Sequence, residues 1–382
     1  MVCAVPDPVT QESRRPPRTA VPDARTRQED SQVSADPMVD DPTAHDTAFR
    51  RPLLPGARGP LSALVIDLLR GDPTSASVLD LPADDPRVVD ADPYGDDLQL
   101  ALYLCYEMHY VGFVDADAGW EWSPALLTVR ATLEQRFLAA LHRDVPAMTA
   151  DDSAEHEMDE LCIENPDGDG ASYRLRDAGT WEQYRQLFAL RSLYHLKEAD
   201  PHAFAIPRLR GHAKAAYVAV EFDEFGGGRG DAVHQELFAD LLRASDLSAD
   251  YLGYLDTVPG VALTPVNLMS LFGLHRRYRG AAVGHLAATE ITSPPGSQRL
   301  LAGLEQLDAP EACRRFYREH VEADAVHEQI LRTDVVGDLI RTEPDTEADV
   351  IFGIRAFLFV EDALDRHVLS AWDDGKSAFP GI

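Results

Sequence analysis

Two histidines and an aspartate are spaced so that a helix would carry all three on one face. His320, Asp324 and His327 lie in residues 316–331, FYREHVEADAVHEQIL, a stretch without Gly or Pro. At roughly 100° per residue, the three side chains fall within a sector of about 60°. Imidazole and carboxylate groups suit iron, manganese or zinc, whereas an apolar core disfavours them without partners. The pattern favours a metal-binding helix, although a polar face turned toward water would also produce it.

Further carboxylates must come from neighbouring helices, because one helix face supplies too few ligands for a pair of metals. Glu198 ends one predicted helix, and Glu290 lies near the end of another. Glu224 precedes His234 by ten residues, across a run of glycines. Each glutamate alone is weak evidence, since glutamates are mostly exposed. Together with the residues of the 316–331 helix they offer four carboxylates and three imidazoles.

These spacings resemble those of the haem-oxygenase-like diiron oxidases and oxygenases, also described as iron-containing redox enzymes. The resemblance covers about residues 173–372. The 316–331 helix matches the family's H-x3-D-x2-H motif, and Glu224 with His234 matches its E-x9-H motif. Glu290 falls at the interval of the second core carboxylate, and Glu198 matches an extra carboxylate of some members. Because other members have E-x6-H, the chain more closely resembles the N-oxygenase-like branch.

The resemblance implies a bundle that holds two iron ions, as Fe(II) or Fe(III), and uses O2 as co-substrate to oxidise a small organic molecule. Such families carry out N-oxygenation, oxidative decarboxylation and C–C cleavage, reactions typical of specialised metabolism. Glu290 would bridge the irons, and Glu198 is either a seventh ligand or a close neighbour of the ligands. Which histidine serves which iron stays open. The implied ligand set is Glu198, Glu224, His234, Glu290, His320, Asp324 and His327.

Other interpretations remain. A non-catalytic metal-binding or scaffold protein of the same fold is the main alternative, but buried carboxylates without a cation are costly. A haem site requires an axial ligand in an apolar pocket, which a cluster of carboxylates does not provide. The remaining histidines of interest are expected to cap helices, pack or face solvent: His109, His195, His202, His212, His275 and His285.

Composition narrows the class of protein. The 382 residues are 45% hydrophobic with a formal net charge of −30, a field that repels nucleic acid. No apolar run approaches the length of about 18 residues that a membrane span needs, and no secretory signal is evident. The four scattered cysteines indicate no disulfide framework, so we expect a cytoplasmic protein. The expected partner is a small-molecule substrate. An electron donor and a homodimer are also compatible with the sequence.

The chain divides by composition into four segments. Residues 1–48 are rich in Pro, Asp, Arg and Ser and are predicted to be a disordered tail. Residues 49–150 form a helical region of unknown role, with helices expected at 61–69, at 98–113 and from Pro124. Residues 151–172 read as an acidic hinge, and 173–382 as the diiron domain. A calcium-like loop within the hinge is rejected because its last ligand position is Arg176.

Helices dominate the predicted diiron domain. They are expected from Thr180 to about Glu198, over 209–225 and from Asp231. A long helix is expected over 265–291, closed by the Ser-Pro-Pro-Gly sequence at 293–296. The helix of His320 should continue to about residue 340, and 349–372 should form the last helix. Strand signals are sparse, so the predicted fold is all-α, a haem-oxygenase-like up-and-down bundle.

Overall fold

The computed structural model describes residues 50–77, 81–165, 168–379 and 381, except the side chains of residues 323–325. Within these ranges every regular element is helical and no strand occurs, which confirms the all-α fold class. The predicted disordered tail lies outside the described residues. Residues 49–382 form one unit by their mutual contacts. No helix in the described ranges is both long and apolar enough to cross a membrane.

A carboxylate on one N-terminal helix binds the first turn of another. Pro60 opens the first helix with its φ already set, and the Asp97 carboxylate accepts the backbone N–H groups of Leu61 and Ser62 at 3.0 and 2.7 Å. The second long helix ends at Glu107, earlier than predicted, and packs against α1 and α11. The elements are α1 (Pro60–Leu69), α2 (Pro86–Val89), α3 (Asp96–Glu107) and α4 (Pro124–Asp144).

The acidic segment contains a helix. In α5 (Ala154–Leu161), Glu155 and Glu157 lie in the first turn, where the helix dipole favours negative charge. The Arg355 guanidinium binds Asp152 at 2.8 Å and Glu157 from Nε at 3.2 Å, which connects the segment to α15. Whether the segment acts as a hinge stays a prediction.

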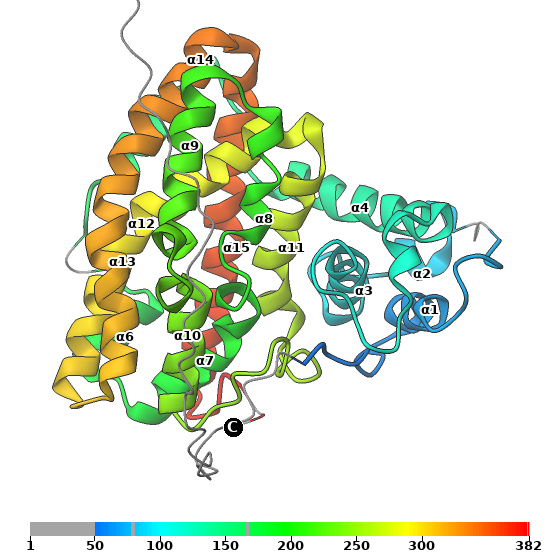
Figure 1. The fold of residues 1–382 in the computed structure, drawn as a ribbon, viewed down its shortest axis with the longest axis horizontal. Coiled ribbons are helices and arrows are strands. Elements are labelled where there is room, and N and C mark those ends of the chain that lie inside the picture. The colour runs from blue at the N-terminus through cyan, green and yellow to red at the C-terminus, as the bar shows by residue number, and fades with distance from the viewer. Residues whose placement is uncertain (1–49, 78–80, 166–167, 380, 382) are drawn as a thin grey trace, which may run out of the picture. The chain divides into compact units, whose positions relative to one another are not determined.

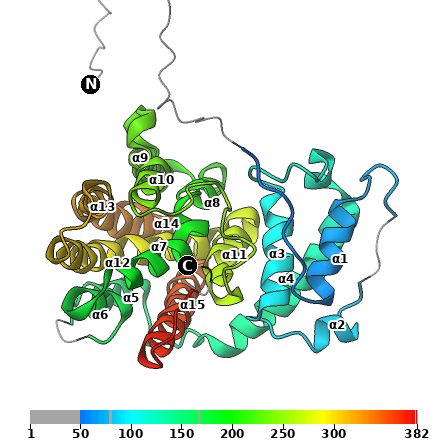
Figure 2. The same ribbon diagram turned by 90° about the horizontal axis from the view of Figure 1, so that it is seen from below.

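The rest of the chain forms a bundle around α12, which packs against α13 and α15 (Figure 1). The same elements are seen from below in Figure 2, with α3 beside α11. Between α13 and α14 the backbone is a π-helix over Ile330–Gly337, so the helix of His320 continues as predicted. The elements are α6 (Ala171–Ala178), α7 (Trp181–His195), α8 (Asp200–Ala203), α9 (Gly211–Glu224), α10 (His234–Ala244), α11 (Gly260–Leu274), α12 (Arg279–Gln306), α13 (Glu311–Gln329), α14 (Asp338–Thr342) and α15 (Glu347–Asp373).

The single helix predicted over 265–291 is wrong at both ends. The helix is interrupted at His275, whose backbone is extended. The Arg208 guanidinium donates to the Gly273 and Leu274 carbonyls at this interruption. The Ser-Pro-Pro-Gly sequence does not close the helix, because α12 runs through both prolines to Gln306. Proline removes a backbone donor, but packing against α13 and α15 along its length outweighs that loss.

Candidate metal centre

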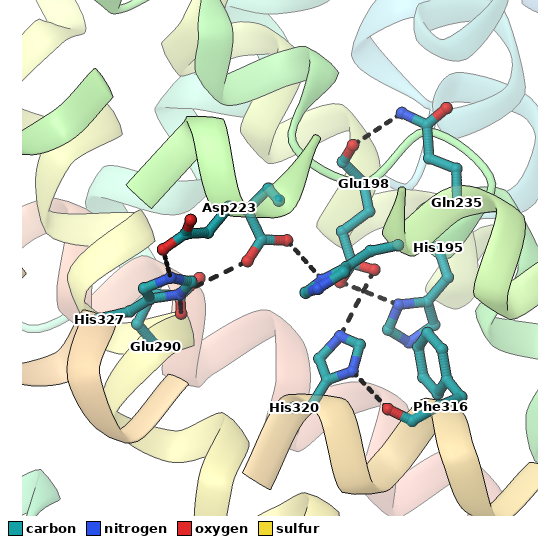
Figure 3. Close-up of polar contacts among 10 residues, drawn as sticks. His195, Glu198, Asp223, Gln235, Glu290, Phe316, His320 and His327 are labelled. Atoms are coloured by element: carbon teal, nitrogen blue, oxygen red, sulfur yellow. Dashed lines mark hydrogen bonds and ion pairs between the residues drawn. The ribbon is translucent and has the colours of Figure 1, made fainter. Parts of the chain in front are cut away.

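Six of the predicted ligands gather into two adjacent groups in the bundle. The first group is Glu198, His234 and His320, and the second is Glu224, Glu290 and His327. Within each group one ligand atom per residue lies within 4.8 Å of the others, and all six residues are buried. In Figure 3, His320 and His327 extend from α13 toward Glu198 and Glu290, respectively. Such side chains are rarely buried together without a partner that relieves their charge.

In the first group, hydrogen bonding selects the histidine nitrogen that faces the centre. Nδ1 of His320 lies 2.8 Å from the Phe316 carbonyl, one turn earlier on α13, and donates its proton there. Nε2 therefore carries the lone pair, and it lies 3.6 Å from Oε2 of Glu198. His234, the first residue of α10, places its ring 4.6 Å from that of His320. The three side chains thus direct one donor atom each to a common point.

In the second group, His327 uses both ring nitrogens. Its Nδ1 lies 3.1 Å from Oε2 of Glu290 and 3.5 Å from Oε1 of Glu224. Its Nε2 lies 3.4 Å from Oδ2 of Asp223, which is more than half exposed at the outer edge of the site. A carboxylate behind a histidine fixes the ring and increases the basicity of the nitrogen that faces a metal.

Glu224 joins the two groups. Its Oε2 lies 2.8 Å from Nδ1 of His234, and its Oε1 faces His327. Glu290, to which the sequence interpretation gave the bridging role, belongs to the second group, where its Oε2 faces His327. The contacts therefore favour Glu224 as the carboxylate between two metal positions.

The donor atoms of both groups suit iron. Oε2 of Glu198 and Nδ1 of His234 are buried without a well-aligned hydrogen bond, and each lies beside a side chain of opposite charge, His320 at 3.6 Å and Glu224 at 2.8 Å. Carboxylate oxygen with imidazole nitrogen is a ligand set found with iron, manganese and zinc. The side chain of Asp324 lies outside the described residues; its backbone belongs to α13.

The charges of the first group also favour a cation. Burial raises the pKa of Glu198, but His195 and His320 outweigh burial and hold its pKa well below the ordinary value. Burial lowers the pKa of His234, but the Glu224 carboxylate more than compensates and raises it. A metal ion can replace the protons that these histidines need to balance the carboxylates.

Glu198 does not end a helix as predicted. Helix α7 ends at His195, and Glu198 lies in the turn before α8, next to Ala199 at φ 71°. The turn is fixed from two sides, because Nδ1 of His195 lies 3.1 Å from Oε1 of Glu198 and Gln235 donates to the Glu198 carbonyl at 2.8 Å. The turn lets Glu198 reach a group whose other members lie on α10 and α13.

The other histidines mostly pack or pair as expected. His202 and His285 face each other across 3.1 Å between α8 and α12, and burial lowers the pKa of both. His195 has a role that was not foreseen, because it orients Glu198. The rest pair away from the groups: His109 with Arg130, His212 with Asp334, and His275 with Glu134.

Sequence reasoning also missed two acidic residues on α9. Asp223 lies beside a predicted ligand and contacts His327. Glu221 precedes Glu224 by three residues, so both share one helix face, and it is only 2% exposed. That spacing was the signal that could have identified Glu221.

A cavity of about 400 Å³ adjoins the first group. Glu198 and His320 form part of its wall, so the first metal position borders it. Farther along the wall, Arg191 on α7 and Glu361 on α15 form an ion pair with one nitrogen–oxygen distance of 2.9 Å. The apolar part of the wall comes from Met269, Phe316 and Phe357. The volume suits a small organic molecule.

Helical bundles are a known setting for metal sites built from carboxylates and histidines on facing helices, which is the arrangement seen here. The comparison with known proteins agrees, since residues 185–362 match the model of the iron-containing redox enzymes. The match over residues 185–362 confirms the resemblance to that family for this part of the chain. The nitrosourea synthase of Streptomyces achromogenes subsp. streptozoticus is 24% identical over 185 residues. The match covers 47% of this chain and 39% of that enzyme.

Proposed function

We propose that the protein is a non-haem diiron oxidase or oxygenase that uses O2 to oxidise a small organic molecule bound in the cavity. The observation that carries the proposal is the pair of buried groups joined by Glu224 and bordered by the cavity. The family that matches residues 185–362 is described as iron-containing, which supports iron as the metal. Two Fe(II) ions would supply the electrons that reduce O2.

The residues would divide the work by group. Glu198, His234 and His320 would hold the iron beside the cavity, and Glu290 and His327 the iron farther from it, with Glu224 between the two. His195 would keep Glu198 in place, and Phe316 would keep the His320 proton on Nδ1, away from the metal. The apolar wall would exclude water around the substrate. Asp324 remains a predicted ligand from its motif.

The reaction proposed first is N-oxygenation, with oxidative C–C cleavage or decarboxylation as the alternatives. The relative is named for producing a nitrosourea, a compound with a nitrogen–oxygen bond, which supports this order. Repeated turnover requires new electrons, so an electron-donating partner belongs to the proposal. The free thiols of Cys105, Cys162 and Cys313 support a reducing, cytoplasmic setting.

The test is anaerobic reconstitution with Fe(II), followed by metal analysis and optical and Mössbauer spectroscopy before and after O2. We expect about two irons per chain and an optical change on exposure to O2. The variants Glu198→Gln and Glu290→Gln should each reduce the iron content toward one per chain, since each removes a ligand from a different group. Tight binding of one zinc per chain, without an optical change, would contradict the proposal.

A further inference from the structure

A lysine and a glutamate are fully buried together at the junction of α3 and the α7–α8 turn. Lys197 is 1% exposed, Glu107 is 0% exposed, and the lysine Nζ donates to Oε2 of Glu107. Tyr251 donates to the other carboxylate oxygen, Oε1, at 3.0 Å. Removing two charges from water is costly, so such a pair persists only where its geometry is well satisfied.

Three tyrosine rings enclose the ammonium group. The Lys197 Nζ lies 4.4 Å from the ring centroid of Tyr110, 4.6 Å from that of Tyr103 and 5.6 Å from that of Tyr251. These distances are within the range of cation–π attraction, which strengthens when the cation is desolvated. Two of the rings belong to the segment around α3, so the cage is built largely by the N-terminal helical region. The lysine side chain therefore has one well-defined position.

Lys197 directly precedes Glu198, the member of the first group that lies outside a regular helix. Beyond the end of α7, the backbone N–H of Lys197 still bonds to the Tyr194 carbonyl at 2.9 Å, whereas the bond from Glu198 to His195 is long, at 3.5 Å. Ala199 at φ 71° adds a conformation that non-glycine residues seldom adopt. Burying the neighbouring side chain in a fixed cage restricts the backbone from which the Glu198 carboxylate extends.

We infer that the Glu107–Lys197 pair is a positioning device by which the N-terminal helices set Glu198 in the metal centre. The inference rests on the proposed function in one respect, since it takes Glu198 as a metal ligand. It assigns a role to residues 49–150, whose contribution was unknown from the sequence. Neither Lys197 nor Glu107 would touch a metal or the substrate.

The test uses the full chain and Co(II) as the probe, with metal uptake followed by visible absorption and calorimetry. Lys197→Met alone leaves an unpaired buried carboxylate and is expected to impair folding. The double variant Glu107→Gln/Lys197→Met leaves no unpaired charge and is the decisive protein. We expect its affinity for the metal of the first group to fall about 10- to 100-fold, the range for lost support of a ligand. Binding at the second group should stay unchanged.

Three comparisons make the result specific. Glu198→Gln identifies the spectral change that belongs to the first group, and Glu290→Gln identifies that of the second. Glu134→Gln is the matched control, because Glu134 is also a buried glutamate of the N-terminal region, paired with His275 and Arg130. It should bind both metals as the unaltered chain does.

The outcomes are distinguishable. If the double variant is less stable but binds both metals with unaltered affinity, the pair supports the fold alone and the inference is overturned. Equal weakening of both metal positions would overturn it as well. If the unaltered chain binds fewer than two metals, the proposed function fails before the variants are compared.

Discussion

Among the individual residues, Glu221 is a carboxyl group in an environment that disfavours its charged form. It is buried on α9, and neither carboxylate oxygen makes a hydrogen bond. Burial, followed by the nearby Glu224 and Asp200 carboxylates, raises the pKa of Glu221 to about 9. With its pKa raised this far, Glu221 retains its proton at neutral pH. This arrangement keeps one more negative charge out of the centre.

The raised pKa of Glu221 has a consequence for the stability of the metal-free protein. Between the ordinary glutamate pKa and about 9, the folded chain retains a proton that the unfolded chain releases. The stability of the folded state that depends on this proton is fully present below the ordinary glutamate pKa. It is lost progressively as pH rises toward 9. Glu221→Gln cannot lose a proton, so its stability advantage over the unaltered protein should grow by at most about 1.4 kcal/mol per pH unit.

Urea unfolding in a chelator at pH 5.5, 7 and 8.5 measures this difference for the two proteins. Glu134→Gln, which removes another buried glutamate, serves as the control. A difference between Glu221→Gln and the unaltered protein that stays constant across this range would show that Glu221 ionises normally in the folded state.

Asp223 offers a second prediction at this scale. Its carboxylate lies 3.4 Å from Nε2 of His327, opposite the nitrogen that faces Glu290. Asp223→Asn should weaken metal binding at the second group by about tenfold or more, because the histidine loses the charge behind it. Co(II) titration measures the effect, and Asp231→Asn, an exposed acid in the next turn, is the control. Equal affinities for the two variants would contradict a role for Asp223.

At the scale of elements, α12 and α15 approach closely at two glycines. A Cβ at Gly284 would lie 2.0 Å from the Val350 carbonyl oxygen, and a Cβ at Gly353 would lie 2.1 Å from the Ala281 carbonyl oxygen. Both contacts are with backbone, which cannot move aside as a side chain can. The two helices therefore pack at a distance that only glycine permits, and α12 carries Glu290 to the second group.

Gly284→Ala should destabilise the protein by about 1–3 kcal/mol or more through overpacking. Gly296→Ala is the matched control on the same helix, since its nearest neighbour to a new Cβ is an Arg299 nitrogen at 4.0 Å. That variant should be neutral or more stable by up to about 1 kcal/mol, because alanine favours helix. Thermal and urea unfolding compare the two. A Gly284→Ala protein as stable as Gly296→Ala would show that α12 and α15 can separate without cost.

At the level of the whole molecule, the candidate metal centre joins the turn between α7 and α8 with α9, α10, α12 and α13. Without metal, Glu198, Glu224 and Glu290 share one buried region, and like charges there must protonate or separate. Metal binding should therefore supply part of the folding free energy of the bundle. The effect should be greatest on α13, which carries His320 and His327.

Hydrogen exchange of the metal-free and Fe(II)-loaded protein tests this expectation. Amides over residues 316–331 should exchange much faster without metal, while those of α1 and α4 should change little, because these helices carry no member of either group. Equal protection of residues 316–331 in both states would mean that packing alone holds α13.

The sequence was sufficient for the helical class, and it named six residues that the structure brings together, but it did not give their division into two groups. Helical spacing is local and regular, so His320 and His327 had to share a face of one helix wherever that helix packed. A proline at the first helical position identified the start of α4 at Pro124, and the last helix, α15, was also predicted. Proline signals were less reliable: residues 293–296 predicted a helix end, but packing of α12 against its neighbours overrode the local preference.

Only the tertiary structure decided how the groups are arranged. The position of Glu224 between two histidines, the turn that presents Glu198 and the support from His195 all depend on contacts between helices. The burial of Lys197 against Glu107 joins residues 90 positions apart, and no local pattern encodes such a pair. Spacing along a helix fixes which side chains point the same way, whereas the packing of helices fixes what they meet.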